Sequence, residues 1–499
     1  MSNMLKQKFV LDFGSKIFVY VIGGLTGIVV ARVAGPSVVG TVAYGFSFVS
    51  MFGFIFGLFG TSHIKLISGG EDLGKCNRIY STLMSSSVLI YIFIVLTYFL
   101  IKKNIYDSNL TQEEQIVIFI SMIVVSVQSL FKIGEVTFIA LTQQAKANIP
   151  SLFRAIIYNL GRIVVVLMGF GAVALATVNL ISSMLVIPVY IYILRNLSFK
   201  NNWDWNLFKK YLRIGFPILI ITMTNSIMAN YGKVMLKDSS STIELGYYAG
   251  GVSIAGMLMM FGHTAGTVFF PLFSKAFANN DINYIKIQIE KYERFLFLFG
   301  FPIFISLSLF SDPIIPFLMG NKYLASVPVF SILVFASFFS IWGMPYYNLI
   351  NGMNKFNVSA ILNILFFVFF ISLIYSFVNP DIFNLGAIGL AWSLVILNFL
   401  KLLFWNLYNR ITIQIGIGGK ITNIVLINIT FFAIIFFVKT NYLTEVSVFI
   451  QFIFALFTLI LLYIILFALK ILDKNDIMFF IDIFNIKELF NYSKNELKK

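Results

Sequence analysis

One pattern occurs twice in this chain, first as GTVAYGFSFVSMFGFIFGLFGTSHIKLIS from Gly40 to Ser68 and again as GYYAGGVSIAGMLMMFGHTAGTVFFPLFS from Gly246 to Ser274. When the two segments are aligned without a gap, nine of the 29 positions are identical. A composition this apolar gives roughly three identities by chance. A second echo, KAN at 146–148 and KFN at 355–357, has a separation of 209 residues, close to the 206 of the first. The sequence therefore predicts an internal duplication.

The composition indicates an integral membrane protein. Hydrophobic residues make up 59% and charged residues 11% of the 499 residues, whereas soluble domains contain about 25% charged residues. Alternation with a period of two is not sustained anywhere, so helices rather than barrel strands satisfy the backbone. A bilayer core of about 30 Å needs about 20 helical residues. Runs of this length are predicted near 11–34, 38–67, 80–101, 114–141, 151–169, 172–194, 211–236, 244–272, 294–311, 324–350, 357–378, 384–408, 420–438 and 446–469.

The distribution of Lys and Arg predicts the orientation, because cytoplasmic loops carry the excess of positive charge. With both termini inside, 26 of the 36 basic residues lie nearer the cytoplasmic face and 7 lie nearer the outer face. Lys132, Arg162 and Lys401 remain within the membrane. We attribute the net charge of +15 to inner loops that lie next to the anionic lipid of the cytoplasmic leaflet. No nucleic acid is therefore expected as a partner. The single cysteine, Cys76, excludes a disulfide or a cysteine-based zinc cluster within one chain.

The repeat also predicts the architecture. An offset near 206 residues covers six predicted spans, so equivalent segments cross the membrane in the same direction, as in parallel repeats with the substrate path between them. The predicted fold is an all-α integral membrane protein of about 14 transmembrane helices, with two parallel six-helix lobes, a central cleft and two C-terminal helices. Its parts are an N-lobe at 1–200 (spans 1–6), a C-lobe at 201–410 (spans 7–12), spans 13 and 14 at 411–470, and a cytoplasmic tail at 471–499.

Several motifs resemble those of one known family of membrane proteins. ARVAGPSVVG at 31–40 is similar to the turn after that family's first span. ELGYYAGGVSIAG at 244–256 and FFPLFSKAF at 269–277 resemble the two ends of its eighth span, and INGMNKFNVSAILNI followed by NLGAIGLAWS resembles its tenth-to-twelfth span region. On these motifs the chain resembles the polysaccharide and O-antigen flippases in the multidrug/oligosaccharidyl-lipid/polysaccharide exporter superfamily, and the resemblance covers residues 10–410. One departure is that many relatives carry an Asp-Arg or Asp-Lys pair where this chain has Gly232-Lys233.

The resemblance implies a flippase, not an enzyme, that moves an undecaprenyl-diphosphate-linked oligosaccharide, such as an O-antigen unit, to the outer leaflet by alternating access. It implies a multi-pass protein of the bacterial inner (cytoplasmic) membrane with both termini in the cytoplasm. Membrane lipids are expected partners, and a polysaccharide polymerase and a chain-length regulator are candidates. No cofactor is expected. A proton (H+) or sodium (Na+) gradient is the expected driving force, since the chain has no G-x-x-x-x-G-K-[ST] motif for ATP hydrolysis.

Lys132 and Glu135 stand inside the apolar run 114–141. A charge at the bilayer centre costs about 2.5–3.5 kcal/mol even on the lenient insertion scale. Positions three apart share a helix face, so both side chains are expected to point together into a protein-lined or hydrated cleft. Two interpretations stay open. Either the pair locks this helix to a neighbour, or Glu135 is a protonatable coupling-ion group that controls the charge of Lys132.

Arg154, Tyr158 and Arg162 recur every four residues and predict a basic stripe on one face of the fifth span. Lys16 lies at the inner end of the first span, with an acid and a tyrosine at the same spacing on either side. Guanidinium groups bind phosphate oxygens through two parallel bonds, whereas an ammonium acts as a point charge. Together with Lys132, these residues form the candidate site for an anionic head group. For Lys16 and Arg154, snorkelling to lipid phosphate is the alternative.

Two more residues are candidates for the cleft. His263 lies deep in the eighth span among small residues and is a candidate ligand or pH-sensitive group, with a hydrogen-bonded packing role as the alternative. Lys233, near the outer end of the seventh span, is a candidate exit-side contact, with outward snorkelling as the alternative. His63 and Lys65 are expected to be surface anchors at the inner end of the second span.

Three other classes of protein compete with the flippase. A membrane polymerase, ligase or glycosyltransferase needs paired carboxylates or metal ligands, and the longest external connections, near 102–113 and 378–385, contain no such cluster. A multidrug exporter of the same superfamily shares the two-lobe plan but usually ends after twelve spans, so spans 13 and 14 favour the lipid-linked sugar carrier. A non-transporting assembly subunit would use the intramembrane charges for packing alone.

Overall fold

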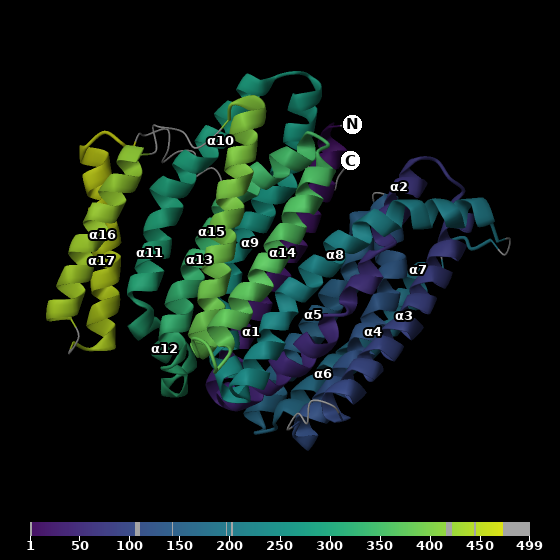
Figure 1. Cartoon of the computed structure of the whole chain (residues 1–499), viewed down its shortest axis with the longest axis horizontal. Coiled ribbons are helices and arrows are strands. Elements are labelled where there is room, and N and C mark those ends of the chain that lie inside the picture. Colours follow the sequence, from purple (N-terminus) through teal and green to yellow (C-terminus); the bar gives the residue numbers. More distant parts are fainter. Residues whose placement is uncertain are drawn as a thin grey trace. The chain divides into compact units, whose positions relative to one another are not determined.

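Helices form every regular element in the part of the chain that the structure describes (Figure 1). The structure is a computed structural model. Long apolar helices provide 12 candidate membrane spans, or up to 13 if the bent pair Trp205–Phe216 and Ile218–Ser239 is one span. The predicted all-α membrane fold is therefore confirmed for the described residues. These residues are 2–104, 110–141, 143–195, 197–200, 203–415, 422–443 and 446–472.

A break inside α1 (Ser2–Ser50) explains the difference from the 14 spans expected. The helix is interrupted at Gly35, where φ is 83° and ψ is 173°, a conformation that glycine adopts without a steric penalty. The residue 206 positions further on, Ser241, lies between α8 (Trp205–Ser239) and α9 (Thr242–Ala278). The break thus has the same place in the first repeat as the α8–α9 turn has in the second. If the helical segments before and after Gly35 are counted as two spans, the total rises from 13 to 14.

Two compact units divide the chain. Unit 1 comprises Met1–Gly250 and Leu362–Leu390, and unit 2 comprises Gly251–Ile361 and Ala391–Lys499. Because α9, α14 (Phe356–Val378) and α15 (Gly386–Ile413) contribute to both units, the lobe boundaries at 200 and 410 stay a prediction. The other elements of unit 1 are η1 (Gly53–Gly57), α2 (Gly60–Ser68), α3 (Leu73–Asn104), α4 (Gln112–Ala140), α5 (Gln144–Leu167), α6 (Ala172–Leu185) and α7 (Ile187–Leu194). The other elements of unit 2 are α10 (Ile282–Phe295), η2 (Leu296–Gly300), α11 (Phe301–Leu309), α12 (Ser311–Met319), η3 (Asn321–Tyr323), α13 (Ser326–Gly352), α16 (Thr422–Tyr442) and α17 (Val448–Ala468).

Polar caps determine where two functionally important helices of unit 1 begin. At the start of α4, Thr111 Oγ1 accepts the backbone N–H of Glu114 at 3.2 Å, and Glu114 Oε2 accepts the backbone N–H of Thr111 at 3.0 Å. This capping box satisfies two donors that the helix itself leaves unpaired. At the start of α8, the Asp204 carboxylate accepts the backbone N–H groups of Asn206 and Leu207. These caps fix the register of every charged side chain further along the two helices.

The helices α1 and α9 cross at two glycines that the repeat makes equivalent, Gly40 and Gly246. A Cβ on Gly40 would lie 1.9 Å from the carbonyl oxygen of Thr242, and a Cβ on Gly246 would lie 1.9 Å from the carbonyl oxygen of Pro36. Pro36 and Thr242 are themselves 206 positions apart. The contact is therefore reciprocal, as it is between segments related by a two-fold axis. We call this contact the glycine crossing, and all of it lies inside unit 1.

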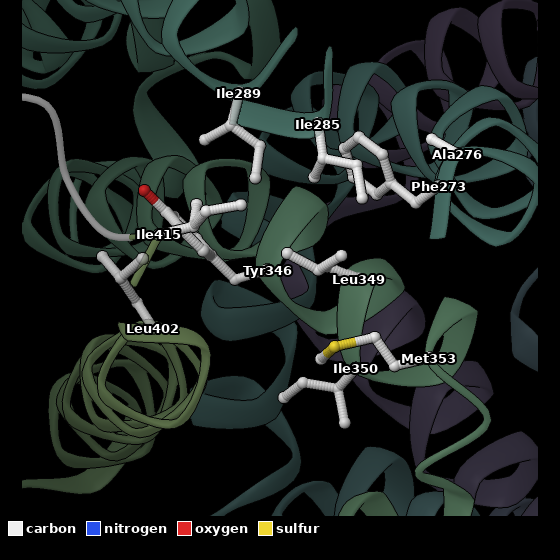
Figure 2. Packing of buried hydrophobic residues seen from close by; sticks show 10 residues of the cluster. All are labelled: Phe273, Ala276, Ile285, Ile289, Tyr346, Leu349, Ile350, Met353, Leu402 and Ile415. Atoms are coloured by element: carbon white, nitrogen blue, oxygen red, sulfur yellow. The ribbon is translucent and has the colours of Figure 1, made fainter. Parts of the chain in front are cut away.

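A cluster of buried side chains connects α9, α10, α13 and α15 in unit 2 (Figure 2). Tyr346, Leu349 and Ile350, on α13, are each 0% exposed. The cluster also contains Phe273, Ala276, Ile285, Ile289, Met353, Leu402 and Ile415. Close van der Waals packing stabilises helices inside a membrane. Such packing and hydrogen bonds from α13 to Glu293 of α10 hold these elements of unit 2 together.

The glycine crossing makes a prediction about stability. We expect Gly246→Ala to lower the free energy of unfolding by about 1–3 kcal/mol, the usual cost of overpacking, because the new methyl group would overlap the carbonyl oxygen of Pro36. The measurement is thermal unfolding of the purified protein in detergent. Gly256→Ala, on the same helix but with no atom within 4 Å of the added Cβ, is the matched control. Equal melting temperatures for the two variants would contradict the close approach.

Candidate functional site

Charged and aromatic side chains from α4 and α5 gather in unit 1. Lys132 and Glu135 lie on α4, and Arg154, Tyr158 and Arg162 lie on α5. All five side chains are half-buried. We call these five residues the basic cluster.

Hydrogen bonds orient both arginines of the basic cluster. Arg154 Nη1 donates to Asn179 Oδ1 on α6 at 3.5 Å, and Arg162 Nη1 donates to Asn159 Oδ1 at 3.4 Å. The Arg162 guanidinium also stands 5.1 Å from the centre of the Tyr158 ring, within range of a cation–π interaction. Each arginine therefore donates one N–H to the side-chain amide of an asparagine, and the guanidinium group has further N–H donors.

The acid of the basic cluster faces more than one cation. Glu135 interacts electrostatically with Lys132 on its own helix and with Arg154 on α5. It also interacts with Tyr190 on α7, whose ring stacks on Phe131 with centroids 4.1 Å apart. Glu135 thus interacts with two of the three cations, Lys132 and Arg154, and the formal charges of the five residues sum to a positive value. A phosphate group fits this donor set, because forked guanidinium groups bind its oxygens in pairs.

Close helix packing holds the basic cluster in place. Gly161 lies between Tyr158 and Arg162, and a Cβ there would come within 2.6 Å of Val178 on α6. Gly134 lies between Lys132 and Glu135, and a Cβ there would come within 2.8 Å of Leu194 on α7. Small residues of this kind let membrane helices approach each other closely. The glycines therefore press α5 against α6 and α4 against α7.

The other predicted cleft residues lie on helices other than α4 and α5. Lys233 lies on α8, where it is half-buried, and the neighbouring Gly232 packs against Leu390 and Ile374. The side chains of Lys16, on α1, and of His263, on α9, lie outside the described residues. The roles of these three residues stay predictions.

The expectation that His63 is a surface anchor is wrong. Its side chain is 0% exposed, and its ring stacks on Tyr80 with centroids 4.1 Å apart. His63 Nδ1 lies 2.6 Å from the Tyr211 hydroxyl and Nε2 lies 2.8 Å from Thr137 Oγ1. The sequence could not show this, because the partners come from α8 and α4, far away in the chain. Lys65, two residues further on, is exposed.

Buried charges elsewhere were also missed by the sequence reasoning. Glu293 of α10 is 0% exposed and accepts hydrogen bonds from Trp342 Nε1 at 2.8 Å and from the Tyr346 hydroxyl at 2.6 Å. In unit 1, Lys102 pairs with Asp238, and Lys237 pairs with Glu114. Glu293 directly precedes the apolar run predicted near 294–311. This position could have indicated it, because an ionisable residue in or next to a membrane span is a functional candidate.

Exposed ion pairs join the α2–α3 turn to the segment before α8. Lys200 pairs with Asp72, and Lys75 Nζ lies 3.1 Å from Asp204 Oδ2. The hydrogen bond from Lys200 lowers the pKa of the Asp72 carboxyl. The backbone N–H of Leu207, followed by the Lys75 ammonium, lowers the pKa of Asp204. Exposed pairs of this kind contribute little to stability, so this contact positions the start of α8 rather than holding the fold.

The fold and the basic cluster define a multi-pass membrane protein built like a transporter. The profile of a family described as polysaccharide biosynthesis protein matches residues 29–328, which is more than half of the chain. The chain belongs to this polysaccharide biosynthesis protein family, and the resemblance seen in its motifs is confirmed at that level.

Two curated relatives match part of the chain. A Shigella flexneri protein named "Putative O-antigen transporter" is 21% identical over 204 residues, which are 41% of this chain and 47% of that protein. An uncharacterized membrane protein of Methanocaldococcus jannaschii is 25% identical over 188 residues, which are 36% of each chain. The chain thus spans less than half the length of these relatives.

Solved structures show the same fold at low sequence identity. The lipid II flippase MurJ in its inward closed conformation matches with a TM-score of 0.72 and 16% identity, covering 93% of this chain and all of that one. A multidrug resistance MATE family transporter matches with a TM-score of 0.56 and 15% identity, covering 79% of this chain and 94% of that one. The chain therefore has the fold of these two solved structures.

The environment of His63 makes a second stability prediction. We expect Thr137→Val to destabilise the protein by about 1–3 kcal/mol, because a buried ring nitrogen would lose its partner. Thermal unfolding in detergent measures the effect. Thr82→Val is the control, since Thr82 Oγ1 donates only to the Arg78 carbonyl oxygen at an exposed position. If Thr137→Val melts no earlier than the control, the hydrogen bond to His63 contributes nothing.

Proposed function

We propose that this protein is a flippase that moves an undecaprenyl-diphosphate-linked oligosaccharide, an O-antigen or other surface polysaccharide unit, across the inner membrane by alternating access. The observation that carries the proposal is the basic cluster. It brings Lys132 and Arg154 to one acid, Glu135, on two packed helices, with Arg162 two turns further along α5. A diphosphate has the charge and the oxygen geometry that such a donor set binds.

The number of helices favours a lipid-linked substrate over a drug. In addition to the helices that make up the repeats, the chain has α16 and α17, which lie side by side in unit 2 (Figure 1). The MurJ structure covers more of this chain than the MATE structure does, 93% against 79%. We infer that α16 and α17 are part of the machinery that accommodates a lipid-linked substrate, whereas a drug exporter of the same superfamily functions without them.

The same proposal includes the location and the partners. Both termini face the cytoplasm in this scheme, because 26 of the 36 basic residues then lie on the side where anionic lipid attracts them. The oligosaccharide is collected on that side and delivered to a polysaccharide polymerase and a chain-length regulator on the other. A proton or sodium gradient supplies the energy, with Glu135 as the coupling acid. No nucleic acid takes part.

Removal of cations from the basic cluster tests the substrate site. We expect Arg162→Ala and Lys132→Ala to reduce surface polysaccharide about tenfold or more in a strain lacking the native gene, since a charge-assisted hydrogen bond contributes about 1.5–3 kcal/mol. Arg162→Lys should restore part of the loss, because it keeps the charge but not the fork. Surface polysaccharide is measured by gel or antibody, together with the amount of protein in the membrane.

Lys209→Ala is the control for this experiment, because Lys209 is exposed on α8 and lies outside the basic cluster. If Arg162→Ala and Lys132→Ala proteins are present in normal amounts and surface polysaccharide is normal, the assignment of the basic cluster as the substrate site is wrong. If the variants instead change only the export of cationic drugs, the exporter is the correct function.

The coupling role of Glu135 makes a separate prediction. In vesicles loaded with a fluorescent lipid-linked oligosaccharide, we expect Glu135→Gln to abolish the stimulation of translocation by a proton or sodium gradient. Slow exchange without a gradient should continue, because the amide keeps the size of the side chain but cannot change charge. Wild-type translocation that ignores both gradients would exclude ion coupling altogether.

A further inference from the structure

A second group of charges lies away from the basic cluster, where α3 and α8 end and α4 and α9 begin. Lys102, near the end of α3, forms an ion pair with Asp238, near the end of α8. The Lys102 side chain is 8% exposed and that of Asp238 is 31% exposed. Lys102 Nζ also donates to the Tyr44 hydroxyl at 3.0 Å. A buried ammonium thus has a carboxylate and a hydroxyl oxygen as acceptors.

A second ion pair lies beside the first. Lys237 Nζ is 3.1 Å from Glu114 Oε2, with side chains that are 10% and 3% exposed. Thr242 Oγ1, at the start of α9, donates to Glu114 Oε1 at 2.8 Å. The Glu114 carboxylate therefore caps its own helix and also binds Lys237 of α8 and Thr242 of α9. A buried carboxylate with this many donors is well satisfied as long as the helices stay together.

Tyr44 of α1 connects the two pairs. It is 0% exposed, and its hydroxyl donates to Asp238 Oδ1 at 3.4 Å. The Lys102 Nζ lies 5.3 Å from its ring centre and the Lys237 Nζ lies 4.8 Å from it, both within the range of cation–π attraction. The side chain of Tyr44 therefore contacts the charged residues of α3 and α8.

We propose that Tyr44, Lys102, Glu114, Lys237 and Asp238 form a latch that closes the outer end of the protein and opens to release the translocated head group. The latch joins α1, α3 and α4 of the first repeat to α8 and α9 of the second. This step rests on the proposed function for the direction of transport. The chemistry of the closure does not depend on it.

Charges make a reversible closure, and apolar side chains do not. Separating two apolar surfaces exposes them to water at a cost of about 25 cal/mol per Å². Separating an ion pair at the membrane surface allows water to hydrate both partners, and this hydration offsets much of the lost attraction. The latch is therefore stable when closed and has an accessible open state.

The glycine crossing provides the place about which the latch opens. Thr242 takes part in both structures, because its carbonyl oxygen touches Gly40 and its hydroxyl donates to Glu114. At the crossing itself the atoms nearest to each glycine are backbone atoms of the other helix. Two helices in such contact can rotate against each other while the ion pairs next to them break.

Cysteine labelling tests the latch without any knowledge of the substrate. The reporter is Ser47→Cys in a Cys76→Ser background, because Ser47 is 2% exposed and lies one turn beyond Tyr44 on α1. A maleimide that cannot cross the membrane is added from outside to intact cells. We expect Lys102→Met and Asp238→Asn each to raise the labelling rate about tenfold, because breaking a buried pair shifts the balance toward the open form.

The swapped pair separates a latch from a general loss of folding. Lys102→Asp combined with Asp238→Lys should label within about threefold of the parent, since the attraction is restored with its sign reversed. Lys103→Met, which removes the exposed neighbour of Lys102, should label as the parent does. The total reporter thiol after denaturation corrects each rate for the amount of protein.

Two outcomes would overturn the proposal. One is that Lys102→Met and Asp238→Asn label at the rate of the parent. The other is that the swapped pair labels as fast as the single variants. The result also separates this proposal from the proposed function: if labelling responds as expected while Arg162→Ala still exports polysaccharide normally, the latch stands and the assigned substrate does not.

Discussion

The close approach of α1 and α9 is the constraint on which the rest of unit 1 depends. Two peptide backbones come together at Gly40 and Gly246 because neither residue has a Cβ that would strike the other helix. Each glycine faces the partner that the repeat predicts, so the two copies of one ancestral segment meet around a common axis. A single side chain at either position would push apart the ends of α8 and α3 and with them both ion pairs of the latch.

The helices could be predicted from the sequence and the contacts between them could not. Uninterrupted apolar runs define each span, and a repeated segment defines the symmetry, because both are local patterns. Even the break at Gly35 falls between two predicted spans. The position of His63, however, depends on a tyrosine and a threonine that belong to other helices. Local periodicity contains no information on which distant helix covers a given face.

For the charged residues, too, patterns within one helix could be predicted and contacts between helices could not. A stripe such as Arg154, Tyr158 and Arg162 is visible because its members share one helix. The proximity of Glu135 to Arg154 follows from the packing of α4 on α5 and was not expected from the sequence. Lys102 and Asp238 gave no such signal, since each stands at the end of a span where an isolated charge is ordinary. Their pairing follows from the packing of α3 and α8, which composition does not show.

The helix α4 carries residues of the latch and of the basic cluster and a partner of His63. Along α4, Glu114 belongs to the latch, Lys132 and Glu135 belong to the basic cluster, and Thr137 holds His63. From Glu114 to Lys132 the helix rises about 27 Å, and from Glu114 to Thr137 about 35 Å, the order of a bilayer's thickness. A continuous helix of this length moves as one body, because its backbone hydrogen bonds resist local bending. The proposed anion site and the proposed latch therefore lie on one continuous helix.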